Sequence, residues 1–192
     1  MWRHTVVAVK LMLLTLLLLG VIYPLLITGV AQVVFPKQAN GSLIKVNNRV
    51  VGSELIGQQF TRPEYFHPRP SAAGYDATAS GGSNLGPTSR ALAGRVKQEI
   101  ARLMKDNPNL KPGAIPADMV TASASGLDPD ISLANAYAQV VRVAKARHMS
   151  EDSVRRLVEL NLTDRQFGLL GEPRVNVLRL NLALAVRGTT QP

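Results

Sequence analysis

The sequence has no cysteine and only three histidines, His4, His67 and His148, among its 192 residues. Without cysteine the chain cannot form disulfide bonds, a cysteine-ligated zinc site or a lipid-modified cysteine anchor. The three histidines lie far apart in the sequence and do not form the closely spaced pair that is typical of structural zinc motifs. We therefore expect no metal site.

Runs of like charge are also missing, although the chain is strongly basic. Lysine and arginine number 22 against 13 aspartates and glutamates, which gives a formal net charge of +9. A nucleic-acid-binding protein gathers such charge into a patch, and here the basic residues are scattered. We therefore expect no nucleic-acid partner, while membrane lipid headgroups or an acidic protein partner remain compatible with the charge.

Charge is entirely absent from Leu11 to Phe35, which consists mostly of leucine, valine and isoleucine. About 25 helical residues span about 37 Å, enough to cross a hydrocarbon core of about 30 Å. A cleaved signal peptide is the alternative, but its apolar part is shorter, at roughly 7–15 residues. We predict a short cytoplasmic head at 1–10, a single transmembrane helix at 11–35 and an extracytoplasmic domain at 36–192.

The remaining chain predicts a mixed α/β extracytoplasmic domain with few strands. Asn47-Asn48 between two short apolar runs predicts a β-hairpin, because asparagine tolerates the positive φ of a tight turn. Three helices are expected: from Thr88 or Ser89 to Asn107, from Asp130 or Ser132 to about His148, and from Ser150 onward.

Two further segments are interpreted as strands. Met119–Ala122 is short and mostly apolar. Val175–Val186 alternates apolar residues but is rich in leucine and alanine, which suit a helix equally well; we interpret it as a strand.

The long stretch Gly57–Thr88 shows neither helical nor strand periodicity. Loops of this length are usually functional or disordered. Four of the nine aromatic residues of the chain fall in it, whereas disordered segments are poor in aromatics. We expect a rigid surface that docks on a partner.

The glycine-rich end of this stretch is the sharpest candidate for a ligand site. Gly81 to Thr88 resembles the phosphate-loop pattern G-x-x-x-x-G-K-[ST], but Pro87 occupies the lysine position and removes a backbone N–H. A glycine-rich turn that leads into a helix is the favoured interpretation. Direct nucleotide binding remains a hypothesis, and its candidate residues are Ser80, Gly81, Gly82, Ser83 and Asn84.

A membrane-tethered hydrolase is the alternative function. It would use His67 with Ser71, Ser80 or Ser83, and Asp76 lies nearby, but the sequence has no G-x-S-x-G elbow. We expect an ordinary loop histidine and no catalytic residues. The basic residues of the later helices are expected on solvated faces: Arg142, Lys145, Arg147, Arg155 and Arg156.

Motifs spread over nearly the whole chain resemble those of the C subunit of the Kdp-type potassium-transporting ATPase. They include Leu55–Gln58, Tyr65-Phe66, Arg69–Ala72, Ser80–Thr88, Gly126–Pro129, Ile131-Ser132, Arg142–Ala144 and Leu170–Asn176. The resemblance implies an accessory subunit of an ATP-driven potassium uptake complex in the bacterial inner membrane, needed for the assembly and stability of that complex. The domain at 36–192 would then be periplasmic. The implied partners are a channel-like potassium-selective subunit, a P-type ATP-hydrolysing subunit and a small accessory subunit.

The resemblance also implies a catalytic chaperone, which raises the ATP affinity of the hydrolytic subunit through a shared complex with ATP. The sequence itself lacks the phosphorylation motif D-K-T-G-T and the filter motif T-V-G-Y-G. We therefore expect a non-catalytic subunit. A periplasmic domain would keep Ser80–Asn84 away from cytoplasmic ATP, so the predicted topology and direct nucleotide binding conflict.

Overall fold

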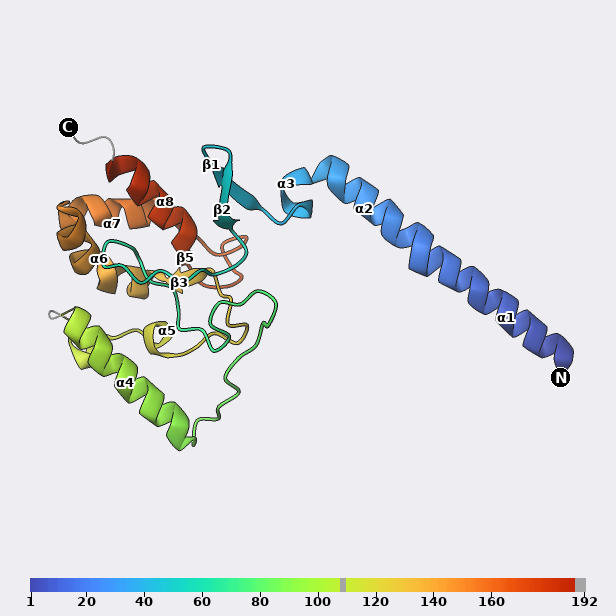
Figure 1. Cartoon of the computed structure of the whole chain (residues 1–192), viewed down its shortest axis with the longest axis horizontal. Coiled ribbons are helices and arrows are strands. Elements are labelled where there is room, and N and C mark those ends of the chain that lie inside the picture. Colours follow the sequence, from blue (N-terminus) through green and yellow to red (C-terminus); the bar gives the residue numbers. More distant parts are fainter. Residues whose placement is uncertain (108–109, 189–192) are drawn as a thin grey trace. The chain divides into compact units, whose positions relative to one another are not determined.

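The computed structural model describes residues 1–107 and 110–188. The chain divides into two units, Met1–Val51 and Gly52–Pro192. The first contains one long helix, followed by a short helix and a hairpin, and the second contains the later helices and a small three-stranded sheet (Figure 1).

The first unit begins with a helix of 33 residues, Trp2–Val34. It consists of α1 (Trp2–Leu17), a π-helical turn η1 (Leu18–Ile22) and α2 (Tyr23–Val34), and none of its residues is buried. The π turn precedes Pro24, which has no N–H to donate to the carbonyl four residues earlier and would clash with it. The predicted span is thus one continuous helix, and the predicted head at 1–10 is part of that helix.

The same unit ends in a short helix and a hairpin. The helix is α3 (Pro36–Ala39), and the hairpin pairs β1 (Leu43–Val46) with β2 (Arg49–Ser53). Asn47 and Asn48 have φ of 48° and 63°. Positive φ at both central positions is the geometry of a tight hairpin turn. The prediction of a hairpin with an Asn-Asn turn is confirmed.

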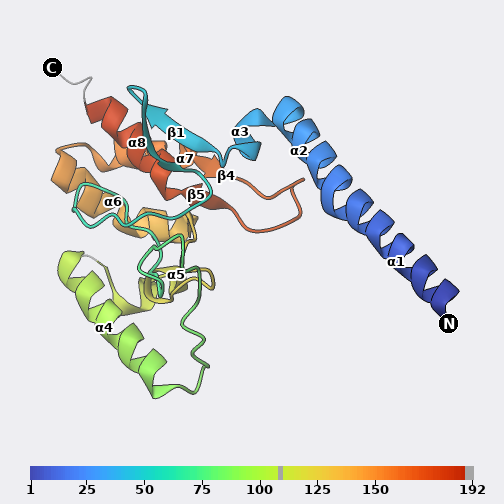
Figure 2. The ribbon, with the colours of Figure 1, turned by 45° about the vertical axis from the view of Figure 1, so that its right-hand side comes forward.

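Four longer helices shape the second unit. They are α4 (Arg90–Asp106), α6 (Leu133–Arg147), α7 (Glu151–Leu160) and α8 (Val177–Gly188). Ser89, Ser132 and Ser150 cap the first three, since each hydroxyl accepts the backbone N–H three residues later. The predicted starts of these three helices are confirmed, as are the ends predicted for α4 and α6. Views in Figures 1 and 2 show α6, α7 and α8 packed together, with α4 to one side.

A three-stranded antiparallel sheet completes this unit, in the order β3 (Asp130–Ser132), β5 (Arg174–Asn176), β4 (Leu162–Thr163). Val175 pairs with Ile131 on one side and Leu162 on the other. The main core joins this sheet to the helices. Its fully buried side chains include Phe66, Ile131, Val140, Val143, Val154, Val158, Val175, Leu180 and Leu184.

A second, smaller core fixes α4. Leu103 packs with Met119 and Val120 of the short helix α5 (Ala117–Val120), which follows the 3₁₀ turn η2 (Pro112–Ala114). The strand predicted at Met119–Ala122 is therefore wrong. The apolar pair that suggested a strand instead forms the buried side of one helical turn.

The strand predicted at Val175–Val186 is also wrong beyond its first residues. Only Arg174–Asn176 is extended, and α8 follows from Val177. Val177, Leu180, Asn181 and Leu184 are buried at the spacing of one helical face. Leucine at every second position obscured this face, because leucine also occupies positions off it.

The stretch Gly57–Thr88 contains no helix or strand, as predicted. Two of its four aromatic residues, however, belong to the core of the unit or pack against it. Phe66 is completely buried and Phe60 packs against the same cluster. The aromatic content is thus explained by internal packing, and it gives no support to the idea that this loop is a docking surface.

Candidate functional site

Two buried side-chain amides hold the centre of the long loop. Asn181 accepts the Phe66 N–H at 2.8 Å and donates to the Phe66 carbonyl at 3.0 Å. Gln139 does the same for His67, at 2.7 and 3.0 Å. In a β-sheet, a neighbouring strand bonds the backbone N–H and carbonyl of a residue in this way. Here α6 and α8 supply the partners, so a loop without ladder bonds can lie in the core.

Two arginines of α6 fasten the preceding part of the loop. Arg142 donates to the carbonyls of Pro63 and Tyr65 and to the Gln139 side chain. Arg147 donates to the Glu64 carbonyl at 2.7 Å and lies over the Tyr65 ring, 5.2 Å from its centroid. Burial lowers the pKa of Arg142 to about 10, which still leaves it charged at neutral pH. The prediction of solvated faces is wrong for these two arginines.

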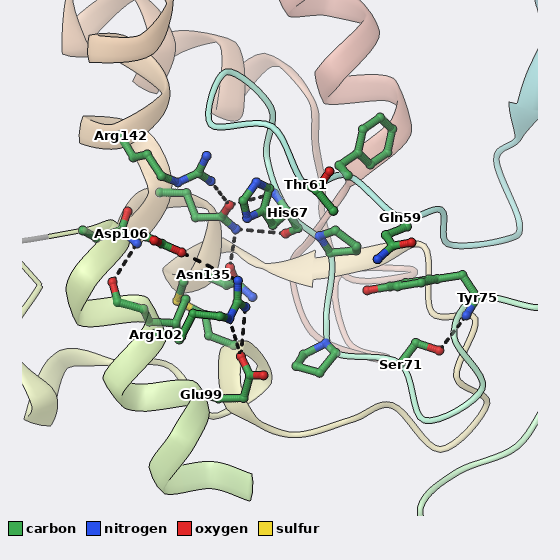
Figure 3. Close-up of a pocket in the computed structure, with 17 residues that line it drawn as sticks. Gln59, Thr61, His67, Ser71, Tyr75, Glu99, Arg102, Asp106, Asn135 and Arg142 are labelled. Atoms are coloured by element: carbon green, nitrogen blue, oxygen red, sulfur yellow. Dashed lines mark hydrogen bonds and ion pairs between the residues drawn. The ribbon is translucent and has the colours of Figure 1, made fainter.

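A cavity of about 320 Å³ opens where the loop meets α4 and α6 (Figure 3). From α4, Arg102 lies 2.9 Å from Glu99 and 3.7 Å from Asp106. From α6, Asn135 and Arg142 face the cavity, and Asn135 donates to the Asp118 carboxylate at 3.1 Å. The cavity is thus lined by charges of both signs. Arg102 is paired with two carboxylates, whereas Arg142 is bonded to backbone carbonyls and a side-chain amide.

His67 lies in the wall of this cavity. Its Nε2 is 3.0 Å from the Arg62 carbonyl oxygen, a contact that a protonated Nε2 makes as donor. Burial lowers the pKa of His67, and the nearby positive charge of Arg142 lowers it further. The imidazole is therefore neutral at neutral pH.

The serines predicted as possible nucleophiles have other partners. Ser71 donates to the Gly126 carbonyl at 2.6 Å and accepts the N–H groups of Ala73 and Tyr75. Ser80 donates to the Ser125 carbonyl at 3.0 Å. Figure 3 shows Ser71 next to Tyr75 and away from His67. The described contacts join neither serine to the imidazole, so they give no support to the hydrolase alternative.

The glycine-rich segment Ser80–Asn84 packs against the backbone of residues 124–126. The Gly81 N–H donates to the Ser125 carbonyl at 2.8 Å. A Cβ on Gly82 would lie 2.8 Å from the Ala124 carbonyl oxygen. Glycine is required at position 82 because two backbone segments approach closely. The favoured interpretation, a glycine-rich turn before α4, describes this geometry.

Ser83 and Asn84 are the more open members of the segment. Asn84 is exposed with φ of 50°, and Ser83 is half-buried. The five candidate residues are consecutive and form one segment of the loop. The N–H of Gly81 already donates to a protein carbonyl. A phosphate cradle would aim such groups at the ligand.

Carboxylates near the sheet pair with arginines. Asp128 lies 3.0 Å from Arg69, and Asp130 lies 3.0 Å from Arg174. Burial raises the pKa of Asp130, and the charge of Arg174 opposes that shift. Within residues 1–107 and 110–188, no group of three or more histidine, aspartate or glutamate side chains is arranged to hold a metal ion.

The residues that build this region were not found from the sequence. Asn135, Gln139 and Asn181 are each at most 3% exposed. The available signal was a polar residue on an apolar helical face, as at Asn181 between Leu180 and Leu184. Such a residue needs a buried hydrogen-bond partner, which in this chain is a distant loop.

Comparison with known proteins gives a consistent result. A family model described as "KdpC: K+-transporting ATPase, c chain" matches residues 5–186. A "Potassium-transporting ATPase KdpC subunit" from Gemmatimonas aurantiaca is 60% identical over 179 residues, covering 92% of this chain and 89% of that protein. Proteins of the same description from Koribacter versatilis and Bradyrhizobium diazoefficiens are 55% and 52% identical, each over 96% of this chain and at least 95% of their own length.

Proposed function

The chain belongs to the KdpC family, the c chains of K+-transporting ATPases, and we propose that it is a non-catalytic accessory subunit that assembles and stabilises such a complex. The match over residues 5–186 carries this proposal, because it includes both the long helix and the second unit. The missing D-K-T-G-T and T-V-G-Y-G motifs support an accessory role. Phosphorylation and ion selection would then belong to the hydrolytic and channel-like partners.

The helix Trp2–Val34 is proposed as a single inner-membrane span. Its 33 residues correspond to about 50 Å of helix, more than a hydrocarbon core of about 30 Å requires. Thr15 and Thr28 donate their hydroxyls to backbone carbonyls of the same helix, so neither needs water. The second unit is proposed to lie in the periplasm, with a small accessory subunit also present in the complex.

The proposed function includes raising the ATP affinity of the hydrolytic subunit. Two routes are distinguishable: direct contact of ATP with Ser80–Asn84, or an effect transmitted through the assembled membrane helices. The bond from Gly81 to Ser125 favours the transmitted route, since it occupies a group that a phosphate would use. A periplasmic second unit favours it too, because ATP is cytoplasmic.

A labelling experiment separates these routes. The chain has no cysteine, so Ser83→Cys would carry the only thiol. In sealed cells, a membrane-impermeant maleimide should modify this thiol from the outside. Modification only after the cytoplasmic side is opened would overturn the periplasmic placement and reinstate direct ATP contact.

Assembly tests the accessory role itself. One variant replaces residues 1–35 by a cleavable signal peptide, so that the second unit is exported without an anchor. A control replaces the same residues by an unrelated single-span helix. We expect the exported unit to be lost when the partner subunits are purified. Normal copurification of the exported unit would refute an anchoring role, and recovery by the unrelated helix would show that tethering alone suffices.

A further inference from the structure

The hairpin between β4 and β5 carries an exposed apolar tip, residues 166–170. Phe167 is 91% exposed, Leu169 77% and Leu170 56%. Most large apolar side chains of the second unit are buried or half-buried, whereas these three are presented together on one turn. Contiguous apolar exposure of this kind marks an interaction site.

The hairpin tip is an ordered turn. Gln166 and Leu170 exchange two backbone hydrogen bonds, at 2.8 and 2.9 Å. The N–H groups of Gly168 and Leu169 also donate within the hairpin, to the carbonyls of Arg165 and Gln166. Four of the five N–H groups of residues 166–170 are thus satisfied internally.

Folding gains nothing from an aromatic residue at the centre of this turn. Phe167 has φ of 56°, a left-handed conformation that is unfavourable for a bulky residue. Its side chain buries almost no surface against the rest of the protein. Strain of this kind, without a packing benefit, is typical of a functional position.

We propose that the hairpin tip inserts Phe167, Leu169 and Leu170 into the interfacial region of a lipid bilayer. Because these N–H groups are bonded internally, the apolar side chains can enter the boundary between headgroups and acyl chains without leaving backbone donors unpaired. Residues 166–171 carry no charge. Directly beside them, Arg165 pairs with Glu172 at 2.7 Å, which suits a zwitterionic headgroup layer.

The long helix explains why a weak contact between the hairpin tip and the bilayer can form. The second unit begins 17 residues after the helix ends, so the connection reaches at most about 60 Å. Confinement to this distance raises the effective concentration of the tip at the bilayer surface. The inference rests on the proposed function for one point only, that the helix Trp2–Val34 lies in a bilayer.

Depth-dependent fluorescence quenching tests the inference on the full-length chain. Three variants each carry one cysteine labelled with an environment-sensitive fluorophore: Leu169→Cys at the tip, Arg156→Cys on the exposed face of α7, and Thr15→Cys in the long helix. Each is reconstituted into phosphatidylcholine vesicles that contain lipid spin-labelled near the headgroup. The emission wavelength and the quenching by spin-labelled lipid are measured.

We expect the label at position 169 to show blue-shifted emission and to lose most of its intensity to the spin-labelled lipid, while the label at 156 does neither. Quenching at 15 without quenching at 169 overturns the inference and leaves the anchor proposal intact. Absence of quenching at 15 instead refutes the anchor proposal, and the label at 169 then reports independently on the tip.

A second variant checks that the tip itself makes the contact. Phe167→Asp in the Leu169→Cys background should lower the quenching to the level at position 156. The thermal unfolding temperature should not fall, because Phe167 is exposed and aspartate tolerates its positive φ. Unchanged quenching would overturn the inference. Quenching that disappears when the partner subunits are added, with a crosslink from position 169 to one of them, would assign the tip to a protein socket and overturn it as well.

Discussion

The side chain of Asn181 makes both backbone hydrogen bonds of Phe66, a residue 115 positions earlier in the sequence. Asn181 is 3% exposed and Phe66 is completely buried. The contact joins α8 to the middle of the long loop, and Gln139 of α6 makes the equivalent contact with His67. The centre of the loop is therefore a fixed part of the core.

Replacing Asn181 by leucine should destabilise the protein by about 3 kcal/mol. The change leaves a buried N–H and a buried carbonyl without partners, and each unsatisfied group costs about 1–3 kcal/mol. The free energy of unfolding is measured by urea denaturation of the full chain in detergent. Arg179→Ala on the exposed side of the same helix is the control, since its ion pair with Glu54 is worth at most about 1 kcal/mol. Equal losses for the two variants would contradict the role of Asn181.

Gly82→Ala and Gly81→Ala form a matched pair. A Cβ at Gly82 meets the Ala124 carbonyl at 2.8 Å, whereas a Cβ at Gly81 meets nothing within 4 Å. We expect Gly82→Ala to cost about 1–3 kcal/mol through overpacking, and Gly81→Ala less than about 1 kcal/mol. ATP affinity of the assembled complex is measured alongside. A stable Gly81→Ala complex with weakened ATP binding would favour direct nucleotide contact.

His67 should make stability depend on pH below about 6.5. Burial lowers its pKa in the folded state, so the unfolded chain binds the proton more readily. This contribution is fully present above the unfolded pKa of about 6.5 and is lost as the pH falls toward the folded pKa. Unfolding free energies are compared between pH 7.5 and 5.5 for the natural chain and His67→Gln. The variant should lose less stability on acidification, and identical slopes would refute the prediction.

Arg142→Lys should destabilise the protein although it keeps the positive charge. A lysine ammonium cannot reproduce the planar fork that reaches the carbonyls of Pro63 and Tyr65 and the Gln139 side chain. The expected loss is about 1–3 kcal/mol, because buried acceptors lose their donor. Lys145→Ala, exposed on the same helix, should change stability by less than about 0.5 kcal/mol. A loss at Arg142 no larger than at Lys145 would contradict the assignment.

Local signals predicted much of the fold because they act within a few residues. Ser89, Ser132 and Ser150 cap helices where the sequence places them, and Asn47-Asn48 forms the hairpin turn. For the C-terminal segment, local signals gave the wrong secondary structure. Its leucines fit both periods, and only burial of Val177 and Leu184 on one face selected the helix.

The candidate site was harder to predict, because its hydrogen bonds join segments far apart in the chain. The sequence showed His67 and the glycines, but not that Gln139 and Asn181 would hold the loop or that Arg142 would turn inward.

The sequence by itself determined the long apolar helix, the positions of most helix ends and the family, since these depend on composition, nearby residues and motif identity. Only the tertiary structure decided the role of the stretch from Gly57 to Thr88. Its aromatics suggested a surface for partners, but burial of Phe66 with both backbone groups bonded to Asn181 places the centre of the stretch in the core. A buried backbone needs partners, and only folding brings those amides to it.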